Sequence, residues 1–198
     1  MNRLQEEAEK ILQVYAVNKN LDILKKAKKV FVDKTGTIDE DSDEYESRMS
    51  SFNDWYLFQY QYSTDTSVIQ DYAKKNETEL VSSLLKTSYS VFLFHKINFK
   101  KQIVVKDILH GTKHILAKDN GHLALVEDDI FIGRICEHEN QFYLLNGLCL
   151  LPREILSPLK KACKKIRKTK TVEESEFLLN LERLKTKSTQ YAHIDPVQ

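Results

Sequence analysis

The stretch that most constrains this chain is residues 91–151, where short runs of β-branched and aromatic residues alternate with turn-forming residues. The connections between these runs are too short to hold helices, and parallel strands need long crossovers, so the strands must run antiparallel. Strands this short and closely spaced favour a small barrel or a strongly bent sheet, since closure removes exposed edges. The predicted strands cover 91–99, 102–109, 114–118, 123–126, 130–139 and 141–151.

Helical periodicity dominates the sequence before this stretch. Apolar residues recur at helical spacing over 4–15 and again over 21–32, with charged residues between them. Residues 76–79 (NETE) have the spacing of a capping box, which predicts the start of another helix. The N-terminal part is therefore expected to be a set of amphipathic helices.

Helices are also predicted after the strands. Ser157 followed by Pro158 is typical of a helix N-cap and first turn. A last amphipathic helix is predicted over 172–185, with Leu184 on its apolar face. The expected fold class is therefore α+β, with the bent antiparallel sheet in the centre. The expected divisions are a helical part over 1–90, the barrel-like region over 91–151, C-terminal helices over 152–187 and a loose tail over 188–198.

An acidic segment over 33–46 is predicted to form a mobile loop, because clustered carboxylates repel one another and resist packing. Asp39, Asp41 and Asp43 alternate as the first three ligands of a calcium loop do. However, Glu44 stands where that loop needs glycine, and the twelfth position lacks its glutamate. We therefore expect no calcium site in this segment.

The composition places the chain in the soluble globular class, with 41% hydrophobic and 30% charged residues and a formal net charge of +1. Cys136, Cys149 and Cys163 lie far apart without a CxxC pair, which favours free thiols in a reducing compartment. The N-terminus is acidic rather than apolar, and no run reaches the length of a membrane span. We expect a cytoplasmic protein without a membrane partner.

The aromatic segment 52–62 (FNDWYLFQYQY) contains the first candidate binding residues, Asp54, Trp55 and Tyr56. On a helix these aromatic side chains form a stripe that packs in a core. The alternative is a platform on which nucleic-acid bases stack, although few basic residues lie between the aromatics. Asp54 beside Trp55 suits a general base tuned by apolar neighbours, whereas such an aspartate more often caps a helix or holds a basic side chain.

The second candidate binding set is the basic segment 160–170, which is predicted to be helical. Its cations suit contacts with phosphates, and a solvated helix face is the plainer interpretation. The candidate residues are Lys160, Lys161, Lys164, Lys165, Arg167 and Lys168.

Two groupings resemble metal sites without completing one. His110 and His114 are four residues apart, as in HExxH, but Gly111 places them across a turn and the glutamate is absent. The second grouping, Cys136, His138 and Cys149, lacks an evident fourth zinc ligand. We therefore expect no metal and no cofactor. The chain also lacks a P-loop, a nucleophile elbow and a dinucleotide-binding turn, so no catalytic residue is assigned.

Two short segments carry a family resemblance: 52–58 (FNDWYLF) and 105–111 (VKDILHG). With them the chain resembles a poorly characterised bacterial family in which an F-x-D-W-[FY]-x-F helix precedes a strand region with a D-[LI]-L-x-G turn. Some members of that family also carry a cysteine-rich, zinc-binding SEC-C tail, which this sequence lacks. The resemblance implies the same architecture and no particular activity.

The sequence leaves two functions open. The first is a non-enzymatic interaction or adaptor module that binds another protein through its barrel and charged surfaces. The alternative is a nucleic-acid-associated protein that uses the basic segment 160–170. An enzyme ranks third for want of a reactive constellation, and no pattern indicates the oligomeric state.

Overall fold

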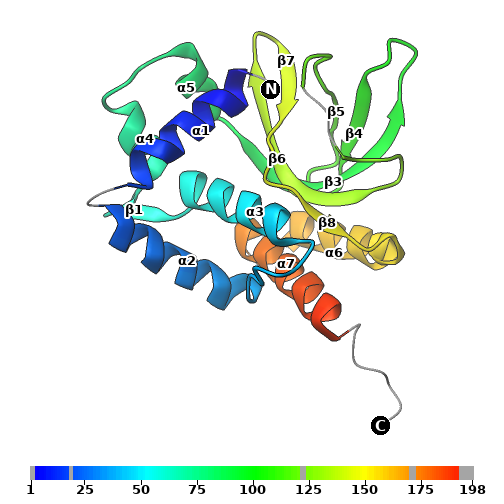
Figure 1. The fold of residues 1–198 in the computed structure, drawn as a ribbon. Coiled ribbons are helices and arrows are strands. Elements are labelled where there is room, and N and C mark those ends of the chain that lie inside the picture. Colours follow the sequence, from blue (N-terminus) through cyan, green and yellow to red (C-terminus); the bar gives the residue numbers. More distant parts are fainter. Residues whose placement is uncertain (1–2, 18–19, 121–123, 170–172, 192–198) are drawn as a thin grey trace.

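Helices occupy both ends of the chain and a curled antiparallel sheet lies between them (Figure 1). This computed structural model describes residues 3–17, 20–120, 124–169 and 173–191. The predicted α+β class is confirmed, with the sheet in the form of a half-barrel. Of the expected features, Leu123, Lys170 and the tail after Tyr191 lie outside the described residues.

The N-terminal helices pack around an aromatic core, and two of them, α4 and α5, begin at a side-chain cap. Gln70 accepts a hydrogen bond from the backbone N–H of Ser67, and Thr78 Oγ1 accepts one from Val81 N–H. The second contact makes Thr78 the cap of α5, two residues after the predicted start at 76. The elements are α1 (Arg3–Tyr15), α2 (Leu21–Thr35), α3 (Tyr45–Phe58), β1 (Gln61–Ser63), β2 (Thr66–Ser67), α4 (Val68–Ala73) and α5 (Glu79–Leu84).

The acidic and aromatic segments have different bounds from those predicted. Helix α2 continues to Thr35 and α3 begins at Tyr45, so the connection is shorter than 33–46. The aromatic helix ends at Phe58, after which 61–63 pairs with β2 as a short strand. The predicted aromatic helix was therefore too long at its C-terminal end. Periodicity alone did not show where it stops, because aromatic residues suit strands as well as helices.

The central sheet has the strand order β5-β4-β3-β6-β7, and β8 pairs with β6 beside β7. The strands pair antiparallel, as predicted. Curling brings the two sides of the sheet together, where the Ala117 N–H donates to Phe142 O over 2.8 Å. The strands are β3 (Ser88–Ile97), β4 (Ile103–Asp107), β5 (Lys113–Ile115), β6 (Ile130–His138), β7 (Gln141–Leu144) and β8 (Cys149–Leu151).

Two predicted strands were wrong in detail. The described residues of 123–126 are not a strand, because the Val126 N–H donates to Asp129 Oδ2 in a turn built on acidic residues. The run 141–151 is divided into β7 and β8, which pair with different parts of β6. The Leu148 N–H donates to Asn146 O in the turn that separates them.

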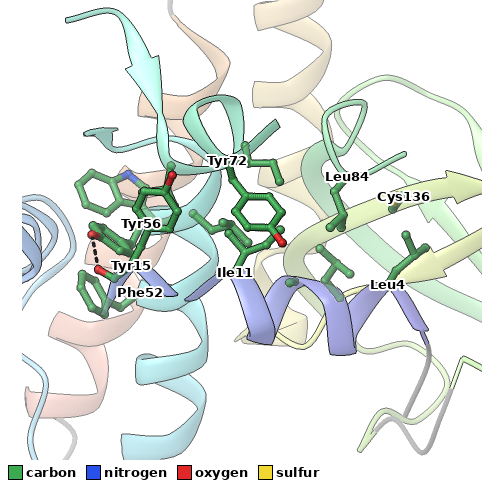
Figure 2. Packing of buried hydrophobic residues seen from close by; sticks show 14 of the residues in the cluster. Leu4, Ile11, Tyr15, Phe52, Tyr56, Tyr72, Leu84 and Cys136 are labelled. Carbon is green, nitrogen blue, oxygen red and sulfur yellow. Dashed lines mark hydrogen bonds between the residues drawn. The ribbon is translucent and has the colours of Figure 1, made fainter. Parts of the chain in front are cut away.

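Three clusters of apolar side chains hold these layers together. One lies inside the half-barrel and includes Phe92 and Phe131. A second joins the outer face of the sheet to the C-terminal helices through residues such as Leu93. The third fills the helical part, where α1 places Leu4, Ile11 and Tyr15 against α3, α5 and the sheet (Figure 2).

The C-terminal helices cover the outer face of the sheet. They are α6 (Leu156–Thr169), which follows a short 3-10 helix (Arg153–Ile155), and α7 (Glu174–Tyr191). Helix α6 begins before Ser157, so that residue lies in the first turn and is not the predicted N-cap. Helix α7 begins at Glu174 in the described chain and continues to Tyr191, beyond the predicted end at 185.

Candidate functional site

A network of buried charges joins the helical part to the sheet. Arg48 on α3 donates from Nη1 to Glu182 Oε2 on α7 over 3.2 Å, and Tyr89 on β3 donates to Glu182 Oε1 over 3.1 Å. Arg48 Nη2 also donates to the backbone oxygens of Thr35 and Gly36 at the end of α2. Burial raises the pKa of Glu182, while Arg48 opposes the shift. The network ties four elements together.

Asp54 belongs to the same interior. It is 6% exposed, and burial raises its pKa to about 6, against the opposing charge of Arg134 and the Gly147 N–H. Gly147 is close enough that a Cβ there would lie 2.3 Å from Asp54 Oδ2. The guanidinium of Arg134 stacks on the ring of Tyr89, 4.2 Å from its centroid. Arg134 Nη2 donates to Gln59 Oε1, and among the described residues Asp54 forms no ion pair within 4.0 Å, so the two charges interact without direct contact.

Trp55 and Tyr56 also lie in the helical core, so the predicted core packing of the aromatic segment is confirmed. Tyr56 is fully buried, and its hydroxyl donates to Tyr15 O over 3.1 Å (Figure 2). The Trp55 ring packs 5.5 Å from that of Phe31. Because both rings are covered by protein, neither offers a free face for a base to stack on.

The predicted histidine grouping is separated in the structure. His110 Nδ1 lies 2.7 Å from Asp107 Oδ2, and its Nε2 lies 3.0 Å from Glu174 Oε2 on α7. Burial disfavours the His110 charge, but these hydrogen bonds to the two carboxylates raise its pKa overall. His114 instead faces Thr112 Oγ1 at 3.0 Å, and His122 lies outside the described residues. His110 therefore links the turn after β4 to the start of α7.

The cysteines do not gather either. Cys136 Sγ donates to Ser83 O over 3.1 Å, and burial raises the pKa of its thiol to about 12. Cys149 on β8 pairs with Ile132 in another layer of the core. Across residues 3–17, 20–120, 124–169 and 173–191, no group of three His, Cys, Asp or Glu side chains could hold a metal ion. These thiols are buried packing residues with little thiolate character.

The six predicted cations of α6 are all exposed and fall into two rows. Residues three or four apart share a helix face, so Lys160, Lys164 and Arg167 make one row. Arg167 places this row beside the turn after β4, because its Nη1 lies so close to Gly111 that a Cβ added there would be only 2.4 Å away. The other row lies on the exposed side of α6, away from its buried residues Leu159, Cys163 and Ile166. Its members are Lys161, Lys165 and Lys168.

An apolar groove of about 390 Å³ runs between α6 and α7. Leu184 on α7 stands at its edge with 65% of its surface exposed, although sequence periodicity placed it on an apolar face. Only Lys185 and Ser188 contribute polar side chains to the lining. The apolar lining residues are Leu151, Pro152, Ile155, Pro158, Leu159, Ala162, Leu181 and Leu184.

A second hollow, of about 210 Å³, lies on the outer face of the sheet beside α6. Lys106 on β4, Lys113 on β5 and Lys160 on α6 all line it. Sequence reasoning found Lys160 but missed the two strand lysines. They are separated in the sequence from the basic helix, and only the strand register brings them beside it.

Comparison with family models gives a match over residues 1–178 to a family described as "Family of unknown function (DUF7986)". The chain belongs to this family. The DUF7986 match covers the whole sheet and α6, including Lys106, Lys113 and Lys160, and it ends within α7 before Leu184. Searches of curated proteins and of solved structures found no significant match. In the described part of the chain, every helix is too short or too polar to span a bilayer.

Proposed function

We propose that this protein is a non-enzymatic interaction module that binds a helical segment of another protein in the groove between α6 and α7. The observation that carries the proposal is the exposed apolar lining of that groove, with Leu184 at its edge. Exposed apolar surface of this kind is characteristic of protein-binding sites. An amphipathic helix lays its apolar face into such a groove through residues spaced at i, i+3, i+4 and i+7.

Charge complementarity defines the partner further. Lys161 and Lys165 lie three residues after the groove residues Pro158 and Ala162, and Lys187 lies three residues after Leu184. Residues at this spacing are neighbours on a helix surface, so two lysines of α6 and one lysine of α7 flank the apolar lining. The matching segment therefore carries acidic side chains beside its apolar face.

The interior supports a binding role rather than a reaction. Burial raises the pKa values of Asp54 and Glu182, and the charges of Arg134 and Arg48 oppose these shifts. The thiols of Cys136 and Cys149 are held in the protonated form by burial. These groups fix the helices against the sheet, which gives the groove rigid walls.

The test uses the full chain and labelled peptides of about 16 residues, with leucines at i, i+3, i+4 and i+7 and glutamates elsewhere. The comparison peptides carry lysines in place of the glutamates, or the same residues in scrambled order. Fluorescence anisotropy should show that the acidic amphipathic peptide binds tightest. Leu184→Asp should weaken that binding by about tenfold or more, because a buried leucine contributes roughly 1.5–3 kcal/mol.

Leu21→Asp provides the matched control, since Leu21 is an exposed leucine at the start of α2. It should leave peptide affinity unchanged. Equal binding of the scrambled peptide, or equal affinities of the Leu184→Asp and Leu21→Asp variants, would contradict the proposal. Sedimentation of the unmodified protein reports whether a second copy of the chain occupies the groove instead.

The proposal also includes a bacterial family relationship and a cytoplasmic location for the protein. The resemblance in 52–58 and 105–111 supports a bacterial family with SEC-C-associated members, and the three separate cysteines support a cytoplasmic location. Separation of cells into cytoplasmic and membrane fractions, with the protein followed by antibody, tests the location. Size-exclusion chromatography of the fraction that contains the protein tests for a stable protein partner.

A further inference from the structure

The outer face of the sheet places lysines directly opposite one another. Lys106 on β4 is paired in register with Lys113 on β5 and with Leu93 on β3. Paired residues of antiparallel strands project to the same face, and Leu93 packs toward α6 on that face. Lys160 of α6 completes the set, because it lines the 210 Å³ hollow together with both strand lysines. Three cations from three elements therefore border one concave surface.

These cations lack carboxylate partners in the described chain. None of Lys106, Lys113 and Lys160 forms an ion pair within 4.0 Å with any residue of the described ranges. Partial burial, then the charges of Lys113, Lys160 and Lys96, lower the pKa of Lys106. Like charges directly opposite each other destabilise a sheet. An anion in the hollow would remove this repulsion.

Two acids of this region, Asp107 and Glu127, are already engaged in hydrogen bonds. Asp107 lines the same hollow, but its Oδ1 accepts from Ser90 Oγ over 2.6 Å and from the His110 N–H over 2.8 Å. Glu127 accepts the Ile97 N–H over 3.0 Å at the far end of β3. These carboxylates are therefore committed to the fold while the lysines remain available.

The charge continues along α6. Lys164 and Arg167 extend the row that begins at Lys160, and a helix rises about 1.5 Å per residue, so this row is roughly 10 Å long. Arg167 reaches the turn after β4 at Gly111. A linear series of cations suits a polymer that carries one phosphate about every 3.4 Å per strand.

The tip of the β3–β4 hairpin adds an aromatic group. Phe99 is 92% exposed there, and Lys100 Nζ lies 5.8 Å from its ring centroid. The tip is ordered, since Asn98 Oδ1 accepts from the N–H groups of Lys100 and Gln102 over 2.9 Å each. Lys96 stands three residues before Phe99, near the end of β3. An exposed ring among lysines is the arrangement on which unpaired bases stack.

The geometry points to a binding site for single-stranded nucleic acid along the hairpin tip, the Lys106–Lys113 pair and the Lys160 row of α6. The lysines contact the phosphodiester backbone, and Phe99 stacks on an unpaired base. This surface is separate from the groove between α6 and α7 and does not depend on the peptide-binding proposal. Helix α6 contributes a different row of cations to each surface.

The experiment measures binding of the full chain to a labelled uridine 20-mer by fluorescence anisotropy at several salt concentrations. Affinity should fall steeply as salt rises, with a log–log slope of about −0.7 for each phosphate contacted. The double variant Lys106→Gln, Lys113→Gln should weaken binding by about tenfold and reduce the slope by about 1.4. Because it removes like-charge repulsion, this variant should fold normally, which thermal unfolding checks.

Lys25→Gln, Lys26→Gln is the matched control, since it makes the same charge change at exposed positions of α2. Its effect on RNA affinity should be less than about twofold, in keeping with long-range screening. Phe99→Ala should weaken binding of the single strand by about tenfold but leave affinity for a 20-base-pair duplex unchanged. Equal losses in the two double variants would reduce the site to a nonspecific charge effect and overturn the proposal.

Vesicles of phosphatidylcholine with and without phosphatidylserine form the last arm, because an aromatic residue among lysines also suits an anionic lipid surface. The proposal requires RNA binding without comparable binding to the anionic vesicles. Vesicle binding that depends on Phe99, in the absence of RNA binding, would overturn it in favour of a membrane surface. The Leu184→Asp variant should bind RNA normally, which separates this result from the peptide test.

Discussion

The junction between the helical part and the sheet differs from the outer face of β4 and β5 in how its charges are matched. At the junction, Arg48 and Glu182 are buried, and each is hydrogen-bonded to the other and to further groups. On the outer face, Lys106 and Lys113 oppose each other, and neither forms an ion pair with a described residue. The junction uses charge to fix one arrangement of elements, whereas the outer face accepts a local cost in stability. The difference indicates which charges serve the fold and which can serve an external ligand.

The largest effect expected from this comparison is at the junction. Arg48→Met should lower the free energy of unfolding by about 3–5 kcal/mol, because Glu182 then remains buried without its cation. Urea denaturation of the variant and of the unmodified chain measures this loss. The double variant Arg48→Met, Glu182→Met should recover much of it. A single variant within about 1 kcal/mol of the unmodified chain would show that the pair is dispensable.

The second effect concerns pH. The pKa of Asp54 rises from 3.8 to about 6 on folding, so the folded protein holds this proton more tightly than the unfolded chain does. The resulting stability is present at low pH and is lost as pH rises from about 4 to 6, and it amounts to roughly 3 kcal/mol. Asp54→Asn lacks this titration. Its stability relative to the unmodified chain should therefore increase by roughly 2–3 kcal/mol between about pH 4 and pH 7.

Chemical denaturation of both proteins across that pH range measures the difference directly. Tyr56→Phe is a suitable companion, because it alters the same helix by removing a hydroxyl that donates to Tyr15 O. The stability change that it causes should not depend on pH in this range. A constant difference between Asp54→Asn and the unmodified chain would show that Asp54 is ionised at the same pH in both states.

The smallest effect is expected on the outer face. Lys113→Gln should raise stability by a few tenths of a kcal/mol at low salt, since it removes one of two opposed charges at a solvated site. The gain should disappear at high salt, where the charges are screened. Differential scanning calorimetry at two salt concentrations measures it. A loss of stability at low salt would indicate that Lys113 has a structural partner.

The sequence was sufficient to predict the architecture, because alternation and turn residues over 91–151 leave little choice but an antiparallel sheet. The sequence was insufficient for features that depend on which strands pair with one another in the sheet. The division of 141–151 into two strands and the pairing of Lys106 with Lys113 both follow from strand register, which is a tertiary property. Leu184 shows the same limit, since periodicity identifies an apolar helix face but not whether another element covers it.

The hydrogen bond from the Ala117 N–H to Phe142 O has a consequence for recognition. The unpaired backbone groups of an edge strand can bind a further strand. Many proteins bind extended peptides, or copies of themselves, in this way. Here Leu116, just after β5, pairs with Phe142 of β7, so part of each edge of the half-barrel is already paired. Pairing with a strand from another chain is therefore disfavoured at that position. Selectivity then depends on the side chains displayed by the C-terminal helices and by the protruding hairpin.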